Sequence, residues 1–202
     1  MPKVVDREAR RREIVEAYLR LVARDGMEQA TSRALAAELG VSSGALWHYF
    51  ANVDQVLFGA FRLIFDRTNE RIAERCVELE GLAALRAMLE EILPLAKVTQ
   101  DEALVVVSFW GRVPTNPELG SFQAEVEGRW REQMVTHLRQ AQASGHVVEA
   151  APLAVIADTL LVLTVGQQVE HVLRSDVATE GRQWELVAAC LEPWLTDAGR
   201  QP

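Results

Sequence analysis

The sequence is poor in the residues that cross-link or break a chain. Only two of its 202 residues are cysteines and only seven are prolines. Cys76 and Cys190 are far apart and fit neither a disulfide framework nor a metal-binding spacing, so we expect reduced, buried thiols. Apolar residues make up 49% of the chain, enough for a sizeable core, which argues against an intrinsically disordered protein.

Long apolar runs and a leader-like start are also missing. We find no apolar stretch that approaches the roughly 20 residues of a membrane span. The first residues, MPKVVDREARRR, lack the apolar segment of a signal peptide. We therefore expect a cytoplasmic protein with no membrane partner.

Recognisable sites for metals, cofactors and catalysis are absent from the pattern. The four histidines, His48, His137, His146 and His171, share no metal spacing such as H-x-x-x-H. Without strand-like alternation, no glycine-rich phosphate loop can follow a strand. Glu170 and His171 are neighbours whose side chains diverge on a helix, so they predict no acid–base pair. We predict no cofactor and no metal, and an enzyme is the weaker alternative.

The net charge of −8 is unevenly distributed. Residues 1–50 carry eight Lys/Arg and seven Asp/Glu, whereas the remainder carries thirteen and twenty-two. A basic cluster lies at the very start: Lys3, Arg7, Arg10, Arg11 and Arg12. A basic end on an acidic protein suits phosphate contact, because only the docking face must release counterions. For any single arginine, a solvated helix start explains it equally well.

Helical periodicity extends through the whole chain and predicts an all-α fold. Breaks fall at Pro114, Pro117, Gly145 and Pro152, where turn residues cluster. We expect a three-helix domain at residues 1–51 and a helical bundle at 52–202. The helices predicted outside the 31–51 region lie at 6–25, 53–79, 82–97, 102–112, 117–144, 152–174 and 180–197.

Residues 31–58, TSRALAAELGVSSGALWHYFANVDQVLF, predict two short helices joined by a tight turn and followed by a longer helix. Thr31, Ser42 and Asn52 are the expected N-caps of the three helices. Gly40 stands where a left-handed residue ends the first of them. This arrangement is the simplest way to push one helix into a DNA groove.

The second short helix has a face free for DNA. At about 100° per residue, Leu46 and Phe50 point toward the core while Gly44 and His48 point away. The free amides at its start suit a phosphate, and Ala45 can touch a thymine methyl group. Few of these side chains can make a bidentate base contact, so readout relies partly on DNA shape.

The run GVSSGALWHYFANVDQVL resembles the recognition helix and following helix of the TetR family of transcriptional regulators. The family pattern is G-V-S-x-G-x-L-Y-x-Y-F-x-[NS]-K-[ED]-x-L. Trp47 replaces the usual Tyr, and Val53 replaces a Lys that typically touches a phosphate. The positions that match are Gly40, Val41, Ser42, Gly44, Leu46, Tyr49, Phe50, Asn52, Asp54 and Leu57.

The resemblance implies an all-α protein with an N-terminal helix-turn-helix domain and a C-terminal bundle for ligand binding and dimerisation. It also implies a homodimer on palindromic double-stranded operator DNA. The predicted DNA-binding residues are Thr31, Arg33, Ser42, Ser43, Gly44, Ala45, Trp47, His48 and Tyr49. For Trp47 the alternative is domain packing, and for His48 an idle surface position.

The last two helices are the predicted dimer seam, since both are more apolar than one small core requires. The alternative is that they only cover the ligand-binding region. The predicted interface residues are Leu153, Ile156, Leu160, Leu163, Leu186, Cys190, Leu191 and Trp194.

The C-terminal part resembles the BetI-type subgroup, through FWGRVPTNPELGSFQ and the following helix with its WRE sequence. An effector pocket needs an apolar cavity with a few polar groups aimed inward. Aromatic rings with a carboxylate would hold an organic cation, whereas Arg112 argues for an anion. The predicted pocket residues are Phe109, Trp110, Arg112, Phe122, Trp130, Thr164, Gln167, Glu170 and His171, each of which can also be a core aromatic or a satisfied interface residue.

The sequence thus predicts a one-component transcriptional regulator, by resemblance a repressor that an unknown small molecule releases from DNA. Movement of the helix that starts at Val53 would change the separation of the two recognition helices. The alternative is a helical ligand-binding or adaptor protein with weakened DNA binding, which only Val53 favours.

Overall fold

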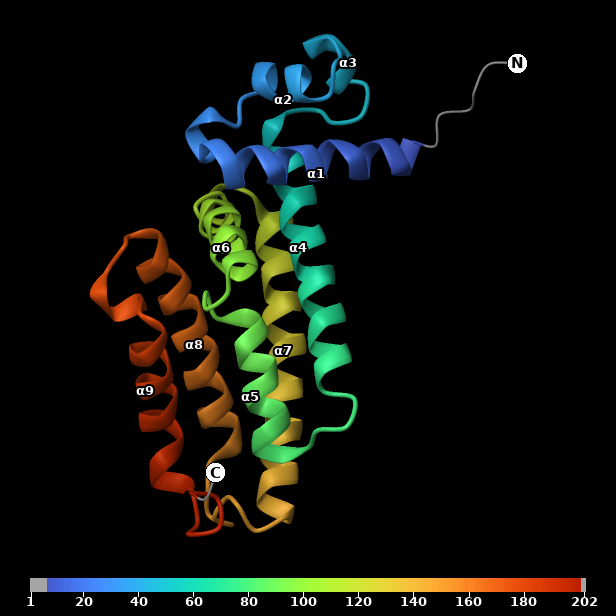
Figure 1. Cartoon of the computed structure of the whole chain (residues 1–202). Helices are drawn as coiled ribbons and strands as arrows, with labels where there is room; N and C mark the ends of the chain where they lie inside the picture. Colours follow the sequence, from blue (N-terminus) through green and yellow to red (C-terminus); the bar gives the residue numbers. More distant parts are fainter. Residues whose placement is uncertain (1–6, 201–202) are drawn as a thin grey trace.

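The computed structural model describes residues 7–200, which fold as a helical protein (Figure 1). Within these residues the only β-type pairing is an isolated antiparallel bridge between Val147 and Leu195. The α-helices are α1 Arg7–Asp25, α2 Ser32–Glu38, α3 Ser43–Leu46, α4 Val53–Arg75, α5 Gly81–Ile92, α6 Lys97–Trp110, α7 Pro117–Ala143, α8 Leu153–Val172 and α9 Glu180–Leu191. Short 3-10 turns lie at Met27–Gln29, Val113–Thr115, Asp176–Ala178 and Glu192–Trp194.

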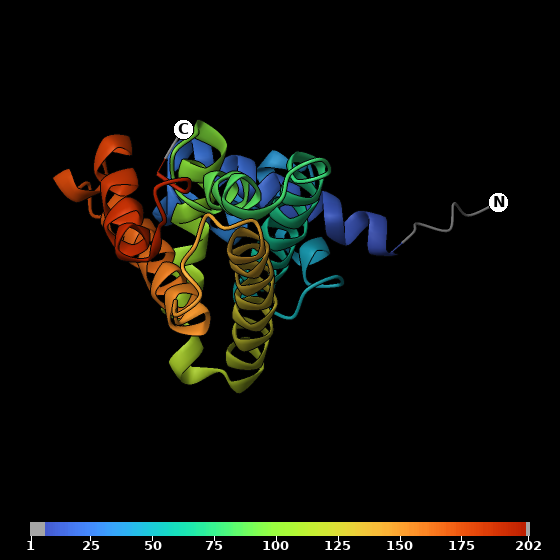
Figure 2. The same cartoon turned by 90° about the horizontal axis from the view of Figure 1, so that it is seen from below.

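The helices form two groups at opposite ends of the molecule. In Figure 1, α1 crosses the upper end of α4, and α2 and α3 lie above it. Helices α4 to α9 extend below as a bundle, and the C-terminus lies at the end remote from α1–α3. Figure 2, seen from below, shows α8 and α9 at one side of this bundle and α4 at another.

The caps expected from the sequence are confirmed. The Thr31 hydroxyl accepts from the Ala34 amide at 3.2 Å, and Ser42 accepts from the Ala45 amide at 3.3 Å. Asn52 Oδ1 accepts from the Gln55 amide at 2.9 Å and starts α4. Gly40, with φ +64°, turns the chain between α2 and α3 in the left-handed region that favours glycine.

Several predicted boundaries are wrong because prolines act locally. Helix α5 ends at Ile92 rather than 97, since Leu93 precedes Pro94 and is extended with ψ 144°. Helix α6 therefore begins at Lys97, five residues earlier than predicted. Helix α9 ends at Leu191, and a 3-10 turn that contains Pro193 follows it.

Two buried cores lie along the molecule, and the first continues from the small helices into the bundle. It joins α1–α3 to the first half of α4, to α6 and to the start of α7. At its centre the rings of Phe61 and Phe109 stack at 3.8 Å, and Phe122 meets Phe61 edge-on at 5.7 Å. The second core joins the end of α4 to α5, α7, α8 and α9. Packing therefore does not stop at residue 51, and the division at 51/52 stays a prediction.

Helix α8 has more apolar residues than the second core buries. Its 20 residues pass the length and composition test for a membrane span, so the expectation that no run is long enough is wrong on those two criteria. Ile156 and Leu160 are 3% and 0% exposed, whereas Val155 and Val162 are 60% and 72% exposed. One face of α8 is thus buried in the protein and another is apolar and uncovered.

Candidate DNA-binding end and effector pocket

The exposed face of α3 has the orientation that its periodicity predicts. Leu46 and Phe50 are buried, at 2% and 4% exposure, and hold the turn against the first core. Trp47 is 39% exposed and His48 is exposed beside it. Of the other predicted DNA-binding residues, Ala45 and Tyr49 are half-buried, and the exposed ones are Thr31, Arg33, Ser42, Ser43 and Gly44.

The basic cluster of α1 lies behind this face and is used partly within the protein. Arg11 Nη1 donates to the Tyr49 carbonyl at 2.9 Å, and its guanidinium lies 4.5 Å above the Phe50 ring. Arg10 is paired with Glu13. Lys3, the first member of the cluster, lies outside the described residues.

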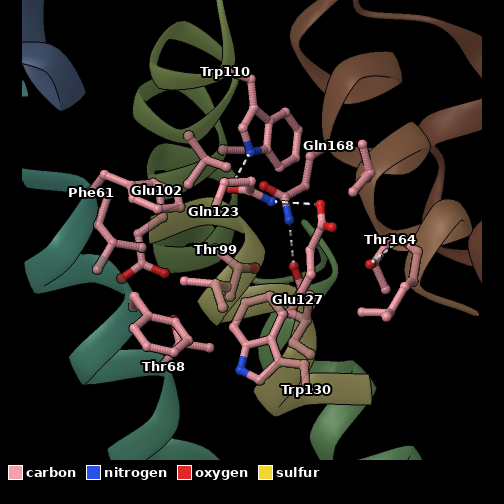
Figure 3. A pocket seen from close by; sticks show the side chains of 18 of the residues that line it. Phe61, Thr68, Thr99, Glu102, Trp110, Gln123, Glu127, Trp130, Thr164 and Gln168 are labelled. Atoms are coloured by element: carbon pink, nitrogen blue, oxygen red, sulfur yellow. Dashed lines mark hydrogen bonds between the residues drawn. The ribbon is translucent and has the colours of Figure 1, made fainter. Parts of the chain in front are cut away.

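A cavity lies within the bundle, between α4, α5, α6, α7 and α8 (Figure 3). The volume of this cavity is about 40 Å³. That is room for about three waters or one compact organic group. Its polar lining residues are Thr68, Glu91, Thr99, Glu102, Gln123, Glu127, Thr164 and Gln168.

Two indoles line this cavity, and both of their N–H groups are engaged. Trp110 Nε1 donates to Gln123 Oε1 at 2.8 Å. Trp130 Nε1 donates to Asn69 Oδ1 at 3.1 Å. With their donors satisfied, the two indoles offer the cavity mainly their apolar surfaces, and the negative face of an indole attracts cations.

Two of the three lining carboxylates are held by arginines. Arg71 donates to Glu91 at 2.7 Å and to Glu102 at 2.9 Å, and Arg75 donates to Glu91 at 2.9 Å. Burial raises the pKa of Glu102, and the Arg71 hydrogen bond offsets this only in part. Burial also acts on Glu91, but hydrogen bonds from Arg75 and Arg71 outweigh it and lower its pKa. The two carboxylates therefore respond differently to acid.

Glu127 is different, because its hydrogen-bond partner is the neutral amide of Gln123. Gln123 Nε2 donates to Glu127 Oε1 at 2.9 Å, which links the carboxylate to Trp110 through one amide. In Figure 3 its side chain lies between the indoles of Trp110 and Trp130. No lysine or arginine is among the described residues that line the cavity. The site therefore has negative charge and aromatic surface and no built-in counter-ion at Glu127.

Three of the nine residues predicted for the pocket line this cavity: Trp110, Trp130 and Thr164. Phe109 and Phe122 do not, because they pack within the aromatic centre of the first core. Arg112 is also outside; it forms an ion pair of 2.6 Å with Asp54, at the start of α4.

Of the four α8 residues predicted for the pocket, only Thr164 lines this cavity. Gln167 is buried at 4% exposure, and its Oε1 has no hydrogen-bond partner among the described residues. Gln167, Glu170 and His171 do not line the cavity, whereas Thr164 and Gln168 do. Gln168 Nε2 donates to the Ile92 carbonyl at 3.4 Å, which ties α8 to the end of α5.

Sequence reasoning missed Glu102, Gln123 and Glu127. Gln123 and Glu127 are four residues apart on α7, and Trp130 follows three residues later on the same face. That spacing is a usable local signal. No local sequence signal pointed to Glu102, because its partner Arg71 is 31 residues away in the chain.

The predicted dimer residues divide into two sets. The prediction is wrong for Ile156 and Leu160, because both side chains are buried inside the second core and have no surface left for a second copy. The half-buried ones, which leave some apolar surface uncovered, are Leu153, Leu163, Leu186, Cys190, Leu191 and Trp194. Burial raises the pKa of the Cys190 thiol, as it does for Cys76, so both thiols are less reactive than free cysteine.

Comparison with known families decides the identity of this arrangement. Residues 14–60 match the family of bacterial regulatory proteins named after tetR, and residues 81–195 match the C-terminal domain of BetI-type transcriptional repressors. The chain belongs to the TetR family of transcriptional regulators. This is a family of helix-turn-helix DNA-binding proteins and not of enzymes.

Similar proteins in the TetR family carry regulator names. The chain is 34% identical over 110 residues to the regulator PksA of Bacillus subtilis, which covers 54% of this chain and 52% of PksA. It is 28% identical over 134 residues to BetI 1 of Chromohalobacter salexigens, which covers 64% and 65%. The matched regions thus span about half to two thirds of these relatives. A regulator from Saccharomonospora viridis, solved in complex with choline, has the same fold, with a TM-score of 0.81 at 21% identity over 92% of this chain and 96% of that one.

Proposed function

We propose that this TetR-family chain is a cytoplasmic homodimeric repressor that binds a palindromic operator and releases it when a small organic cation enters the pocket. One observation carries the choice of effector: Glu127 lies among indole surfaces without a cationic partner in the lining. A quaternary ammonium group fits such a site by cation–π and charge attraction.

Three further facts support a small organic cation. Arg112, the residue that favoured an anion, is engaged with Asp54 outside the cavity. The cavity suits a compact group rather than a long one. The fold relative from Saccharomonospora viridis was solved with choline, which is a quaternary ammonium compound. Choline or a similar cation is therefore the proposed effector class.

The DNA-reading part of the proposal depends on the exposed face of α3. Ser42, Ser43 and Gly44 offer hydroxyls and amides for a phosphate, while Trp47 and His48 reach toward bases. A palindrome requires two such faces, and the uncovered valines of α8 supply an apolar surface for a second copy. We propose that α8 and α9 of two chains pack together there.

Titration with choline chloride and with tetramethylammonium chloride tests the effector, with tryptophan fluorescence as the readout. Trp110 and Trp130 lie in the cavity, so we expect a saturable change. Glu127→Gln keeps the shape and removes the charge, and we expect it to weaken binding about tenfold or more. Glu125→Gln is the matched control, because Glu125 is exposed on the same helix, as Glu127 is, but does not line the cavity. Equal weakening in both variants would contradict the proposal.

The alternative is a helical ligand-binding or adaptor protein that reads DNA weakly. Val53 favours it, because this residue packs half-buried against the first core and carries no charge for a phosphate. A salt-resolved anisotropy titration on duplexes flanking the gene, with His48→Ala beside wild type, separates the two functions. Cation binding without any saturable, sequence-dependent DNA binding would support the alternative.

A further inference from the structure

The recognition helix is short and its end needs support. Helix α3 comprises only Ser43–Leu46, and the chain then turns through Trp47 and His48. The amides of Tyr49 and Phe50 both donate to the Leu46 carbonyl, at 3.0 and 3.2 Å. The last carbonyls of a helical turn have no partner within the turn and need a donor from elsewhere.

Arg11 of α1 supplies that donor. Its Nη1 donates to the Tyr49 carbonyl at 2.9 Å, across 38 residues of chain, in a part-buried contact. Its guanidinium also lies over the Phe50 ring at 4.5 Å, within the range of a cation–π interaction. A cation at the C-terminal end of a helical turn is favoured by the helix dipole as well. Two independent contacts therefore hold one guanidinium against the end of the recognition turn.

We propose that Arg11 is a positioning residue for DNA readout, which sets the orientation of Trp47 and His48 from behind and does not itself contact phosphate. A guanidinium that donates to a carbonyl and lies over an aromatic ring is restricted in its movement toward DNA. Arg7 assists with a longer contact of 3.5 Å from Nη2 to the His48 carbonyl. The basic cluster at the start of the chain thus contains a residue that serves specificity.

Arg12 offers a matched control. It is exposed and adjacent in sequence, and within residues 7–200 its side chain forms no hydrogen bond or ion pair. About 100° of helical rotation separates the two side chains, so they point in different directions. Arg12 is free for a phosphate in the way that Arg11 is not.

The test compares affinity for two duplexes: one enriched by wild-type protein from a random-sequence pool, and a scrambled duplex of equal composition. We expect Arg11→Gln to lower affinity for the enriched duplex about tenfold and to leave the scrambled duplex unchanged. The slope of log affinity against log salt should also stay the same, since each lost phosphate contact lowers it by about 0.9. Arg12→Gln should not change the discrimination between the two duplexes. Its affinity for both should fall by the same factor, or should stay at the wild-type value for both.

Arg11→Lys separates charge from geometry. It keeps the positive charge, so a phosphate role predicts wild-type affinity on both duplexes. A positioning role predicts a partial loss on the enriched duplex alone, because lysine lacks the planar group that both donates and stacks. Wild-type discrimination in Arg11→Lys together with a lower salt slope in Arg11→Gln would overturn the proposal.

Hydrogen exchange checks the same proposal without DNA. We expect the amides of Tyr49 and Phe50 to exchange about tenfold faster in Arg11→Gln than in wild type or in Arg12→Gln. Protection in α5, in the other core, should be the same in all three proteins, which separates a local effect from general unfolding. Unchanged protection at Tyr49 and Phe50 in Arg11→Gln would also overturn the proposal.

Discussion

The two ends of the molecule present opposite chemistry. The α3 end exposes hydroxyls, amides, an indole and an imidazole, with arginines of α1 behind them. The cavity in the bundle presents three carboxylates and two indoles, and no lysine or arginine among the described residues that line it. One end suits a polyanion and the other suits a cation, although the chain as a whole is acidic.

This difference would allow one chain to bind DNA and the proposed cation at separate sites. Both ends contain charges of both signs, but no lysine or arginine is among the described residues that line the cavity, whereas arginines of α1 lie next to the exposed turn after α3. The link between the ends is mostly apolar, through the stacked rings of Phe61 and Phe109 in the first core. An ion pair between Arg112 and Asp54 adds a polar link at the surface.

The largest effect is expected from reversing the chemistry of the DNA end. A Cβ on Gly44 would meet nothing nearer than Ser42 Oγ at 4.0 Å, so a side chain fits there without strain. Gly44→Asp should fold normally and lose at least about a hundredfold in DNA affinity, because like charges placed together cost several kcal/mol. Gly44→Ala is the control and should retain most of the affinity in an anisotropy titration. Similar losses in both variants would mean that the site needs space rather than the absence of negative charge.

The next largest effect should come from the uncovered face of α8. Val162→Glu places a charge where the proposed second copy packs, and burying an unpaired charge is costly. We expect monomers in sedimentation equilibrium and a loss of about thirtyfold in affinity for a palindrome, since two half-sites no longer bind as one unit. Val77→Glu is the control, because Val77 is equally exposed but lies after α4. If the Val162→Glu protein stayed dimeric, the exposed face of α8 would not be the dimer interface.

A smaller effect should appear when the link between the ends is cut. Trp110 lines the cavity, and Arg112, two residues later, pairs with Asp54 at the start of α4. We expect Arg112→Gln to leave the affinities for choline and for DNA near wild type, since exposed ion pairs contribute at most about 1 kcal/mol. Choline should weaken DNA binding by a factor that is about fivefold smaller in Arg112→Gln than in the wild type. A change of this size lies within the usual range of coupling energies between two sites.

Arg131→Gln is the matched control for that coupling. Arg131 and Asp158 form an ion pair of similar exposure between α7 and α8, away from the DNA end. This variant should respond to choline as wild type does. If both variants lose the response equally, the Arg112–Asp54 pair has no special part in the coupling.

Features that depend on contacts between residues close together in the chain could be predicted from the sequence, whereas features that depend on distant contacts could not. The caps at Thr31, Ser42 and Asn52 and the faces of α3 depend on neighbours within four residues, and the structure confirms them. The cavity is assembled from five helices, so no local pattern places Glu102 beside Arg71. Aromatic identity alone was also insufficient, because Phe109 and Trp110 are adjacent on α6 but only Trp110 reaches the cavity.

The smallest effect concerns acid, and it distinguishes Glu102 from Glu91 within the cavity. Burial raises the pKa of Glu102, so the folded protein takes up a proton there at a higher pH than the unfolded chain, whose glutamates titrate at about 4.3. As pH falls through that raised pKa, the carboxylate loses its charge and choline affinity should fall about two- to threefold. The stability of the wild type should instead rise over the same range, because the proton neutralises a buried charge. The difference in unfolding temperature between the wild type and Glu102→Gln should therefore become smaller in acid. The variant should show neither trend in calorimetric titrations and melts from about pH 7 to about pH 5. If binding and stability fell together in the wild type, Glu102 would not be the titrating group. Glu91 would not explain the fall either, because its lowered pKa keeps it ionised over this pH range.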